Sequence, residues 1–395
     1  AGQAFRAFRH RFMREDIEIH ANEEALTLER DAYYGGRTEC FHIGRLSHGE
    51  YYIFDVRSMY PYVMASGKYP VQLIAYAEGT SIRRLRMLSK RYHIIADVNI
   101  VTDDPVYPIR YNKRLCFPVG EFRTSLQGVE LEHALTNNRV KRCHRSAIYF
   151  KVDLFTEYVD ELYGLRLGYA KAGNESFVFL TKRMLNSLYG KFGQRGFEYE
   201  EIGTCDPDEC WQMEVIIDGG DEPVTEFAFG GKVYIRKRLE EAYDSFPAIA
   251  GAVTAYGRMR LWELIEQAGR DNVFYVDTDS LLVNTDGYER LRELIAPDEL
   301  GGLHLDRIAS KVVIFGLKDY SVEGKRKVKG VKSKAVKVGE HAWIEEKWER
   351  FHSALRRGTL EDYRIRLSPK VLKLPYDKGV VHEDGTVTPY RLERK

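Results

Sequence analysis

The sequence predicts an α+β fold, because strand-like and helix-like segments alternate along it and a region of short β-like runs interrupts them. Apolar runs typical of buried strands occur at Tyr51–Val56, Val273–Val276 and Leu281–Val283. Between them lie segments in which apolar residues recur every three or four positions, as in amphipathic helices. Residues 196–237 carry short β-like runs and a Gly-rich turn at 218–220, which predicts a β insertion.

Composition limits the class of protein. With 395 residues and 44% hydrophobic content, the chain can bury a sizeable core, so two or three structural units are expected. No repeat or Ser/Pro-rich linker separates them, so they should be interleaved. No apolar run approaches the roughly 18 residues that span a membrane, and there is no secretory leader, so we expect an intracellular protein without a membrane partner. The cysteines form no CxxC pairs and are expected to be free thiols: Cys40, Cys116, Cys143, Cys205 and Cys210.

A helical hairpin is predicted in the middle of the chain. Residues 153–172 have helical periodicity, Gly173-Asn174 breaks it, and a second helix starts near Glu175. Its expected apolar side consists of Phe177, Leu180, Met184 and Leu188, and its polar side of Lys182, Asn186 and Tyr189. Further helices are predicted at Ala248–Gln267 and, in the tail, at His341–Arg357.

Three carboxylates stand at predicted strand ends. Asp55 ends the strand that precedes a helical turn at Ser58, while Asp277 and Asp279 lie in the turn of a β-hairpin. Alternate residues of an extended backbone point the same way, so Asp277 and Asp279 can face one point. Carboxylates suit Mg²⁺, and two such ions about 3.5–4 Å apart can activate a 3′ oxygen and stabilise a leaving pyrophosphate. A DxD pair alone is a weak signal, because it also occurs in structural turns, in calcium loops and in nucleotide-sugar sites.

The predicted hairpin supplies groups that suit a nucleotide. Lys182 offers a cation for a triphosphate, while Asn186 and Tyr189 offer an amide and an aromatic plane for a nascent base pair. Lys171 and Arg166, near the end of the preceding helix, could supply further cations. For Arg166 the alternative is an ordinary solvated residue at a helix end.

One stretch of the chain is strongly basic, although the formal net charge is only +1. Between residues 325 and 337 no acid separates Lys325, Arg326, Lys327, Lys329, Lys332, Lys334 and Lys337. Such a run could follow phosphates, and the alternative is a solvated loop.

Together these residues resemble the family B DNA polymerases over most of the chain. Asp55-Val-Arg-Ser-Met-Tyr-Pro61 resembles motif A (D-x-x-S-L-Y-P), with Met59 in place of the usual Leu. Lys182-Arg-Met-Leu-Asn-Ser-Leu-Tyr-Gly190 matches motif B (K-x-x-x-N-S-x-Y-G), and Tyr275-Val-Asp-Thr-Asp-Ser280 matches motif C (Y-x-D-T-D-S). Tyr33-Tyr-Gly-Gly36 resembles the YxGG motif, Lys318-Asp-Tyr320 the KxY motif, and Lys327-Val-Lys-Gly-Val331 the Lys-Gly segment that follows KxY.

The resemblance implies a right-hand polymerase fold with an antiparallel-sheet palm, helical-hairpin fingers and a small thumb. The expected division is an N-terminal connecting segment with the YxGG motif (1–50), a first palm part (51–150), fingers (151–195), a second palm part with the β insertion (196–315), and the KxY motif with the thumb (316–395). No exonuclease domain is expected in this chain, because too few residues precede Tyr33, and the DxE at Asp16-Ile-Glu18 is interpreted as coincidence.

The resemblance also implies residue roles. Asp55 and Asp279 would be the principal ligands of two Mg²⁺ ions, with Mn²⁺ as a substitute, assisted by the Val56 carbonyl and with Asp277 beside them. Nucleotide contacts would come from Ser58, Met59, Tyr60, Arg166, Lys171, Lys182, Asn186 and Tyr189, with Tyr60 as a steric gate against a 2′-hydroxyl. DNA contacts would come from Tyr33, Gly35, Gly36, Ser187, Gly190, Thr278, Lys318, Tyr320, Lys327 and Lys329.

The implied activity is DNA-dependent DNA synthesis by a monomer, from dNTPs on a template and primer. The motifs look most like those of phage, plasmid and mobile-element polymerases, so a terminal protein or a priming domain is an expected partner. Two alternatives stay open: a catalytically silent DNA-binding paralogue, and a DxD-type nucleotide-sugar transferase, which would not need motif B. Reverse transcription is disfavoured, since the hairpin reads D-T-D rather than the D-D pair of those enzymes.

Overall fold

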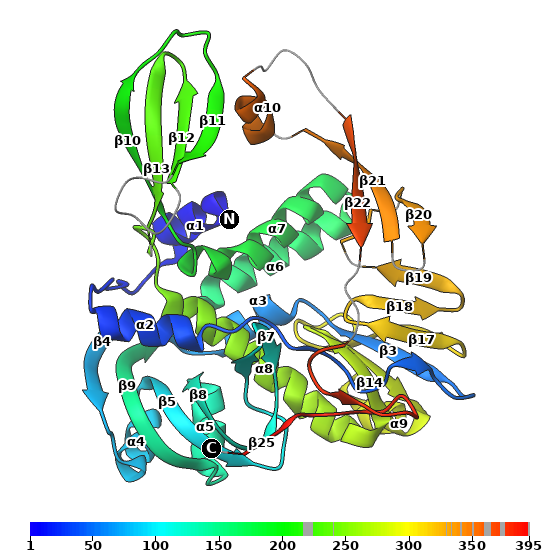
Figure 1. Cartoon of the computed structure of the whole chain (residues 1–395). Helices are drawn as coiled ribbons and strands as arrows, with labels where there is room; N and C mark the ends of the chain where they lie inside the picture. Colours follow the sequence, from blue (N-terminus) through cyan, green and yellow to red (C-terminus); the bar gives the residue numbers. More distant parts are fainter. Residues whose placement is uncertain are drawn as a thin grey trace. The chain divides into compact units, whose positions relative to one another are not determined.

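The computed structural model describes residues 1–215, 224–239, 241–328, 330–332, 334–339, 342–349, 351–358, 365–371 and 376–393. Contacts divide the chain into two compact units, each built from separate segments (Figure 1). The first combines Ala1–Gly193, Phe246–Lys327 and Pro375–Lys395, and the second combines Gln194–Ser245 and Val328–Leu374. Helices and strands are mixed throughout, which confirms the α+β prediction.

An antiparallel five-stranded sheet carries the predicted strand-end carboxylates. Its order is β1 (Thr38–Cys40), β14 (Val273–Asp277), β15 (Ser280–Asn284), β3 (Tyr51–Val56) and β16 (Leu303–Ala309). The predicted strand and the β14–β15 hairpin are therefore confirmed. Helix α3 (Met59–Ser66) follows β3 as expected, and α9 (Thr285–Leu291) with the short 3₁₀ turns Arg270–Asn272 and Arg292–Leu294 completes this region.

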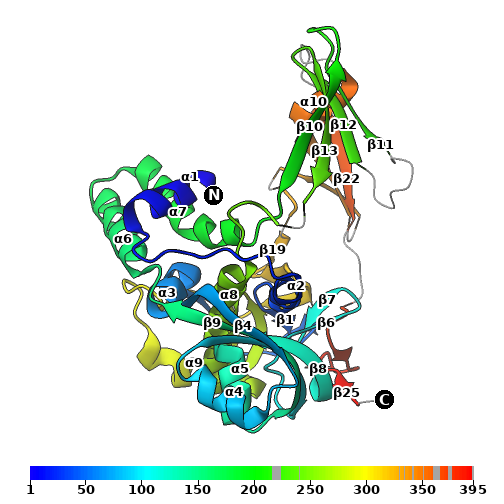
Figure 2. The same cartoon turned by 90° about the vertical axis from the view of Figure 1, so that its left-hand side faces the viewer.

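A second five-stranded sheet in the same unit has the order β25 (Arg391–Leu392), β8 (Val119–Gln127), β5 (His93–Thr102), β9 (Val140–Val152) and β4 (Tyr69–Glu78). Helices α2 (Glu23–Ala32), α4 (Ile82–Ser89) and α5 (Val129–Thr136) pack against it (Figure 2). Helix α8 (Pro247–Ala268), predicted at 248–267, contacts strands of both sheets, so it joins them into one core.

Smaller strands complete the first unit. A four-stranded sheet contains β2 (Gly44–Arg45), β17 (Val312–Gly316), β18 (Asp319–Val322) and β19 (Lys325–Val328). Two further pairs are β6 (Ile109–Tyr111) with β7 (Arg114–Cys116), and β23 (Val380–Val381) with β24 (Val387–Thr388).

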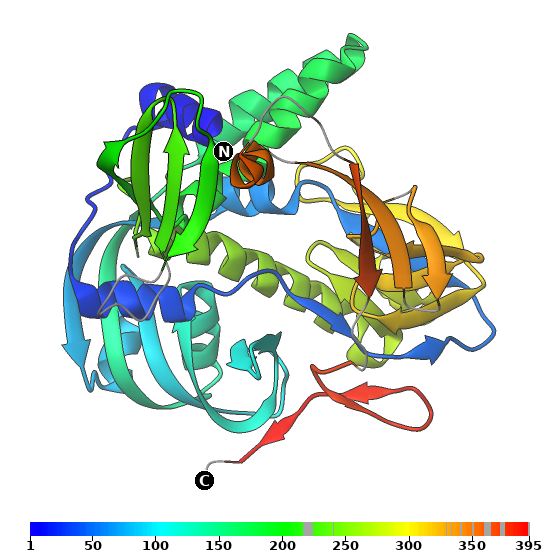
Figure 3. The same ribbon diagram turned by 45° about the horizontal axis from the view of Figure 1, so that its top comes forward.

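The helical hairpin forms as predicted, from α6 (Thr156–Lys171) and α7 (Glu175–Phe192). Asn174 starts α7, where its side chain accepts a hydrogen bond from the Phe177 amide at 3.2 Å. The expected apolar side of α7 is wrong in its outer half, since Phe177 and Leu180 are 46% and 51% exposed. The buried side chains are Thr181, Leu185, Leu188 and Phe192, because packing partners exist at the inner end of the hairpin and the far ends extend beyond α1 (Figure 3).

Residues 2–12 brace the inner end of the hairpin, which the sequence did not suggest. They form α1 (Gly2–Ala7) and a π-helical turn (Phe8–Phe12). The Phe5 ring lies 5.3 Å from the Phe192 ring, and the Phe12 ring lies 5.4 Å from that of Tyr158. Aromatic rings at these separations stabilise packing beyond their buried area.

The second unit contains the predicted β insertion, a sheet of order β10 (Phe197–Thr204), β13 (Lys232–Arg238), β12 (Val224–Phe229) and β11 (Trp211–Val215). The expected turn at 218–220 lies outside the described residues. The helix predicted at 341–357 is wrong in its first half, where β21 (Ala342–Trp348) pairs with β20 (Val336–Gly339) and β22 (Ile365–Val371). Burial alternates there, with Trp343 and Glu345 inside, and only α10 (Phe351–Arg357) is helical.

All five cysteines are free thiols, as predicted. Within the described part of the chain, no helix is long and apolar enough to cross a bilayer.

Candidate active site

Sheet register brings the three predicted carboxylates to one end of the first sheet. Ser280 of β15 pairs with Asp277 on one side and with Asp55 on the other. The Val56 amide donates to the Asp279 carbonyl at 2.7 Å, so Asp279 lies against the end of β3. Residues more than two hundred positions apart in sequence therefore form one acidic group.

The turn that carries Asp277 and Asp279 is held from outside the hairpin. Thr278 has φ 65°, a left-handed conformation that costs a non-glycine residue roughly 1–2 kcal/mol. Its amide donates to the Arg37 carbonyl at 2.7 Å, while the Asp279 amide donates to the Asp277 carbonyl at 2.7 Å. These bonds fix the turn, and Arg37 was not singled out from the sequence.

The KxY motif lies against motif C. Lys318 Nζ is 2.7 Å from Asp277 Oδ1, and the Lys318 amide donates to the Tyr275 hydroxyl at 2.9 Å. The Tyr320 ring lies 5.5 Å from the Tyr275 ring. Asp277 Oδ1 also accepts from Thr38 Oγ1 at 3.0 Å. Asp277 is thus held by both a lysine and a threonine from outside the hairpin.

Asp55 sits in a field of mixed charges. Burial and the nearby Asp306 raise the pKa of Asp55, while His304, Lys182 and Arg57 lower it, and the net direction is upward. His304 lies opposite Asp55 on β16. His304 and Asp306 belong to no motif, and only the pairing of β16 with β3 reveals them.

The donor set fits divalent metal ions. Within the described ranges, no group of three His, Cys, Asp or Glu residues could hold a metal with side chains alone. Mg²⁺ retains water and takes substrate phosphates as ligands, so two adjacent carboxylates suffice. Asp55 and Asp279 are such a pair, because the bond from the Val56 amide to the Asp279 carbonyl brings the end of β3 against Asp279.

Tyr60 is enclosed by aromatic and glycine residues. Its ring lies 4.7 Å from the Tyr189 ring at an angle of 39°. A Cβ on Gly36 would lie 2.8 Å from the Tyr60 hydroxyl oxygen and 2.9 Å from Thr278 Cγ2, and one on Gly257 would lie 3.3 Å from Tyr60 Cε1. Burial, reinforced by Tyr189, raises the pKa of Tyr60, so its hydroxyl stays protonated. Tyr60 of motif A therefore lies against Tyr189 of motif B and Gly36 of YxGG, and Gly36 in turn lies close to Thr278 of motif C.

The YxGG segment is anchored on α8. Arg258 donates to the carbonyls of Tyr34 and Gly35 at 2.9 and 2.7 Å. Its side chain is buried in an ion pair with Glu130 at 2.7 Å. The half-buried Tyr33 packs on the end of α7, because a Cβ on Gly193 would lie 2.4 Å from Tyr33 Cε1. Gly35 differs from Gly36, since a Cβ there would meet nothing within 4 Å.

On the polar side of α7, Lys182 is the residue that lies near the carboxylates. Lys182 is exposed and close enough to lower the pKa of Asp55. Asn186 is exposed, Ser187 is half-buried, and a Cβ on Gly190 would meet nothing within 4 Å. The side chain of α7 that contacts another motif is thus Tyr189, while Asn186 and Gly190 border open space.

The two extra cations of the hairpin differ. Arg166 Nη1 donates to Ser58 Oγ at 2.9 Å, and burial lowers the pKa of Arg166. It is therefore tied to motif A rather than solvated. Lys171 is exposed at the end of α6. Ser58 has φ 54°, and the Met59 side chain is buried in the core, which leaves its backbone as the part that could face a nucleotide.

The basic run is heterogeneous. Arg326 donates to both carboxylate oxygens of Asp319 at 2.7 and 2.6 Å and lies 4.2 Å from the Phe315 ring centroid, so it stabilises its own sheet. Lys325 and Lys327 are exposed on β19. Lys329 lies outside the described residues.

Known proteins resemble this chain in sequence and in fold. The profile of the family described as DNA polymerase type B, organellar and viral, matches residues 1–267. A probable DNA polymerase of Neurospora intermedia is 25% identical over 97% of this chain and 39% of its own length. The DNA-directed DNA polymerase of Enterobacteria phage PRD1 is 26% identical over 74% of this chain and 50% of its own length. The chain thus spans half or less of these relatives.

Solved structures agree on the fold. Phi29 DNA polymerase, in a complex with primer-template DNA and incoming nucleotides, has a TM-score of 0.63 and 18% identity, over 94% of this chain and 67% of its own. Another crystal form of that polymerase gives a TM-score of 0.65 over the same shares. Because the profile covers more than half of the residues, this chain belongs to the organellar and viral type B DNA polymerases.

Proposed function

We propose that this chain is a DNA-dependent DNA polymerase that adds deoxynucleotides to a 3′ end by two-metal nucleotidyl transfer. The observation that carries the proposal is the convergence of three distant motifs: Asp55 lies beside the hairpin of Asp279, within the electrostatic reach of Lys182. In this reading the first sheet is the palm, α6 and α7 are the fingers, and residues 316–395 include the thumb. The segment 1–50 connects to the palm parts 51–150 and 196–315, with the fingers at 151–195.

Metal ions would be held by Asp55, Asp279 and the Val56 carbonyl, with Asp277 beside them. When bound, two Mg²⁺ ions, or Mn²⁺ in their place, would favour the ionised 3′ oxygen and stabilise the leaving pyrophosphate. Asp277 would act mainly through Lys318, since their ion pair places a cation next to the metal-binding pair. A lysine so placed suits the phosphate of the terminal primer nucleotide.

The other residues would bind and orient the substrates. Lys182 and Lys171 would bind the triphosphate, with Arg166 supporting Ser58 and the Met59 backbone. Asn186 and Tyr189 would border the nascent pair, and Tyr60 would exclude a 2′-hydroxyl. Contacts to the template and primer would come from Tyr33, Gly35, Gly36, Ser187, Gly190, Thr278, Tyr320, Lys327 and Lys329.

For the residues described, we propose synthesis without a 3′–5′ exonuclease. The DxE at residues 16–18 has a structural role, because Glu18 forms a β-bridge with Gln72 and accepts from its side chain at 2.7 Å. A monomer that takes its 3′ end from a terminal protein or a priming domain is consistent with the phage and organellar relatives. An initiation assay with and without a DNA primer would test that mode.

Two other functions have weaker support. A nucleotide-sugar transferase would not need α7, whose Tyr189 packs on Tyr60. A silent DNA-binding paralogue would be expected to lose catalytic carboxylates, yet Asp55, Asp277 and Asp279 are all present and grouped.

The decisive experiment is primer extension by the purified chain with Mg²⁺ or Mn²⁺ and deoxynucleotides. We expect Asp279→Ala to abolish extension while the unfolding transition and DNA affinity stay near those of the parent. Robust extension by that variant would refute the site assignment. No extension by the parent, despite DNA binding, would favour the silent paralogue.

A further inference from the structure

A basic pocket of about 790 Å³ lies on the second sheet, outside the candidate active site. It is formed by the end of β4, the loop into α4, and strands β8 and β9. Its positive groups are Arg123, Lys141, Arg142 and Arg145, and His144 lies among them. Glu78 is the one acid among its described lining residues. None of these residues belongs to a polymerase motif.

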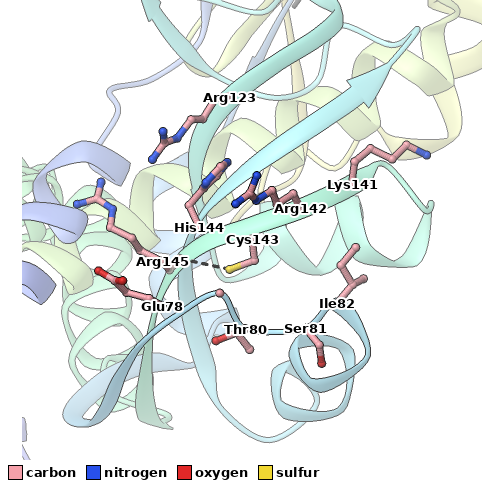
Figure 4. Close-up of a pocket in the computed structure, with 11 residues that line it drawn as sticks. Glu78, Thr80, Ser81, Ile82, Arg123, Lys141, Arg142, Cys143, His144 and Arg145 are labelled. Atoms are coloured by element: carbon pink, nitrogen blue, oxygen red, sulfur yellow. Dashed lines mark hydrogen bonds between the residues drawn. The ribbon is translucent and has the colours of Figure 1, made fainter.

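Strand pairing places the arginines side by side. Asn99 of β5 pairs with Arg123 on one neighbour and with Arg142 on the other, so these two lie across three adjacent strands. His144 Nε2 is 2.9 Å from Asn99 Oδ1. Figure 4 shows Arg123, Arg142, His144 and Arg145 close to one another, with Thr80 and Ser81 below them in this view.

The buried Asp97 pairs with two arginines of the pocket, and the remaining cations have no acidic partner among the residues described. Asp97 accepts from Arg123 at 2.8 and 2.5 Å and from Arg145 at 3.2 Å. Burial raises the pKa of Asp97, but the two arginines outweigh burial and lower it overall, so the carboxylate stays ionised. Lys141 Nζ donates only to the Asn138 carbonyl at 3.3 Å, and the exposed Arg142 has no acid partner among the residues described. The pocket thus presents free positive charge.

Helix α4 begins at the edge of the pocket, which Ser81 and Ile82 line. Ser81 caps the helix, and Arg83 and Arg84 follow without any acid in that turn. Arg83 and Arg84 do not line the pocket, but the N-terminus of the helix adds partial positive charge where Ser81 and Ile82 do. This end of α4 therefore adds no opposing negative charge to the pocket.

The lining determines the class of anion. Its described residues include no Phe, Tyr or Trp, so a base would find no stacking surface. Burial raises the pKa of the Cys143 thiol to about 11, so this side chain adds no negative charge to the pocket. The positive groups extend from β8 to β9, across the intervening strand β5, more than a single phosphate can contact, so a repeating polyanion fits better than a free nucleotide.

We propose that this pocket binds the phosphate backbone of DNA as a second, sequence-independent contact outside the active site. The inference rests on the proposed function insofar as the chain binds DNA. Helix α8 contacts both sheets, so DNA held at the pocket and at the active site would be held by one core.

The test compares Lys141→Ala/Arg142→Ala with the control Lys90→Ala/Arg91→Ala. The control removes an adjacent, exposed Lys–Arg pair from the same layer, outside the pocket. Binding of long duplex DNA, long single-stranded DNA and a short primer-template is measured as salt is raised. We expect the pocket variant to weaken binding of at least one long DNA and to reduce the slope of log affinity against log salt by about 2, one unit per lost phosphate contact.

Single-nucleotide insertion at saturating short primer-template should not change in the pocket variant. Slopes equal to those of the parent on every DNA would overturn the proposal, as would an equal loss in the control pair. A slower insertion step would assign the effect to the active site and also overturn it. If the parent fails to bind any DNA, the proposed function fails first, so the two failures are distinguishable.

Discussion

Lys318 Nζ lies 2.7 Å from Asp277 Oδ1, so the KxY motif and motif C form one ion pair. We predict that Lys318→Ala lowers the efficiency of primer extension about tenfold or more, as expected for loss of a hydrogen bond to a charged group. Steady-state kinetics with varied primer-template would measure it. The exposed Lys311, at the start of the same sheet, is the control, and Lys311→Ala should extend normally. Equal loss in both variants would contradict a specific role for the pair.

Tyr60 should select the sugar of the incoming nucleotide. Tyr60→Val would open the space between Tyr189, Gly36 and Gly257, and we expect ribonucleotide use relative to deoxynucleotide use to rise roughly 10- to 200-fold, the range for small steric differences in a pocket. Tyr60→Phe keeps the ring and should keep discrimination. The ratio of kcat/KM values for the deoxynucleotide and the ribonucleotide measures this discrimination. An unchanged ratio for Tyr60→Val would argue against a steric gate.

Two adjacent glycines offer a matched comparison. A Cβ on Gly36 would meet Tyr60 and Thr278 at under 3 Å, whereas one on Gly35 would meet nothing within 4 Å. We therefore expect Gly36→Ala to lower the free energy of unfolding by about 1–3 kcal/mol, the usual cost of overpacking, and Gly35→Ala to change it little. Urea unfolding of both variants without DNA gives the answer. Similar free energies of unfolding for the two variants would mean that Gly36 is not closely packed against Tyr60 and Thr278.

Arg258 and Glu130 form a buried ion pair that also holds the YxGG carbonyls. Arg258→Met leaves Glu130 buried without a partner, and we expect it to cost about 3–5 kcal/mol of stability. The double variant Arg258→Met/Glu130→Leu removes both charges and should recover part of that loss. Thermal unfolding of the single and double variants tests the coupling, and additive losses would show that the two charges act independently.

The β insertion carries exposed aromatic residues that suit single-stranded DNA. Phe197 and Tyr199 of β10 are 47% and 58% exposed, and Arg236 lies 5.0 Å from the Phe197 ring centroid. We expect Phe197→Ala/Tyr199→Ala to shorten the products made on a primed circular template. Ile202→Ala, which removes an exposed aliphatic side chain from the same strand, is the control. Products of parental length would remove this role.

The sequence predicted the parts of the site that local patterns encode. Residues Tyr51–Val56 form a strand because apolar residues fill both faces, and the 173–174 break separates α6 from α7 as expected. The partners of these elements were not predictable. Arg258 and Glu130 are 128 positions apart, and His304 reaches Asp55 only through strand pairing. The helix expected at 341–357 was wrong in its first half, because alternate residues of β21 are buried there and the many polar residues made this alternation hard to recognise in the sequence.

The C-terminal segment has a consequence for the order in which the molecule can fold. Residues after the second unit return to the first one, where Lys378 donates to the Thr38 carbonyl at 2.8 Å, the Tyr376 hydroxyl accepts from the Cys40 amide at 3.2 Å, and β25 adds to β8. Strand β1 of the carboxylate-bearing sheet thus takes support from residues that leave the ribosome after all three motifs. A nascent chain that already contains Asp55, Asp277 and Asp279 cannot complete the native packing around them until residues 376–393 have been synthesised.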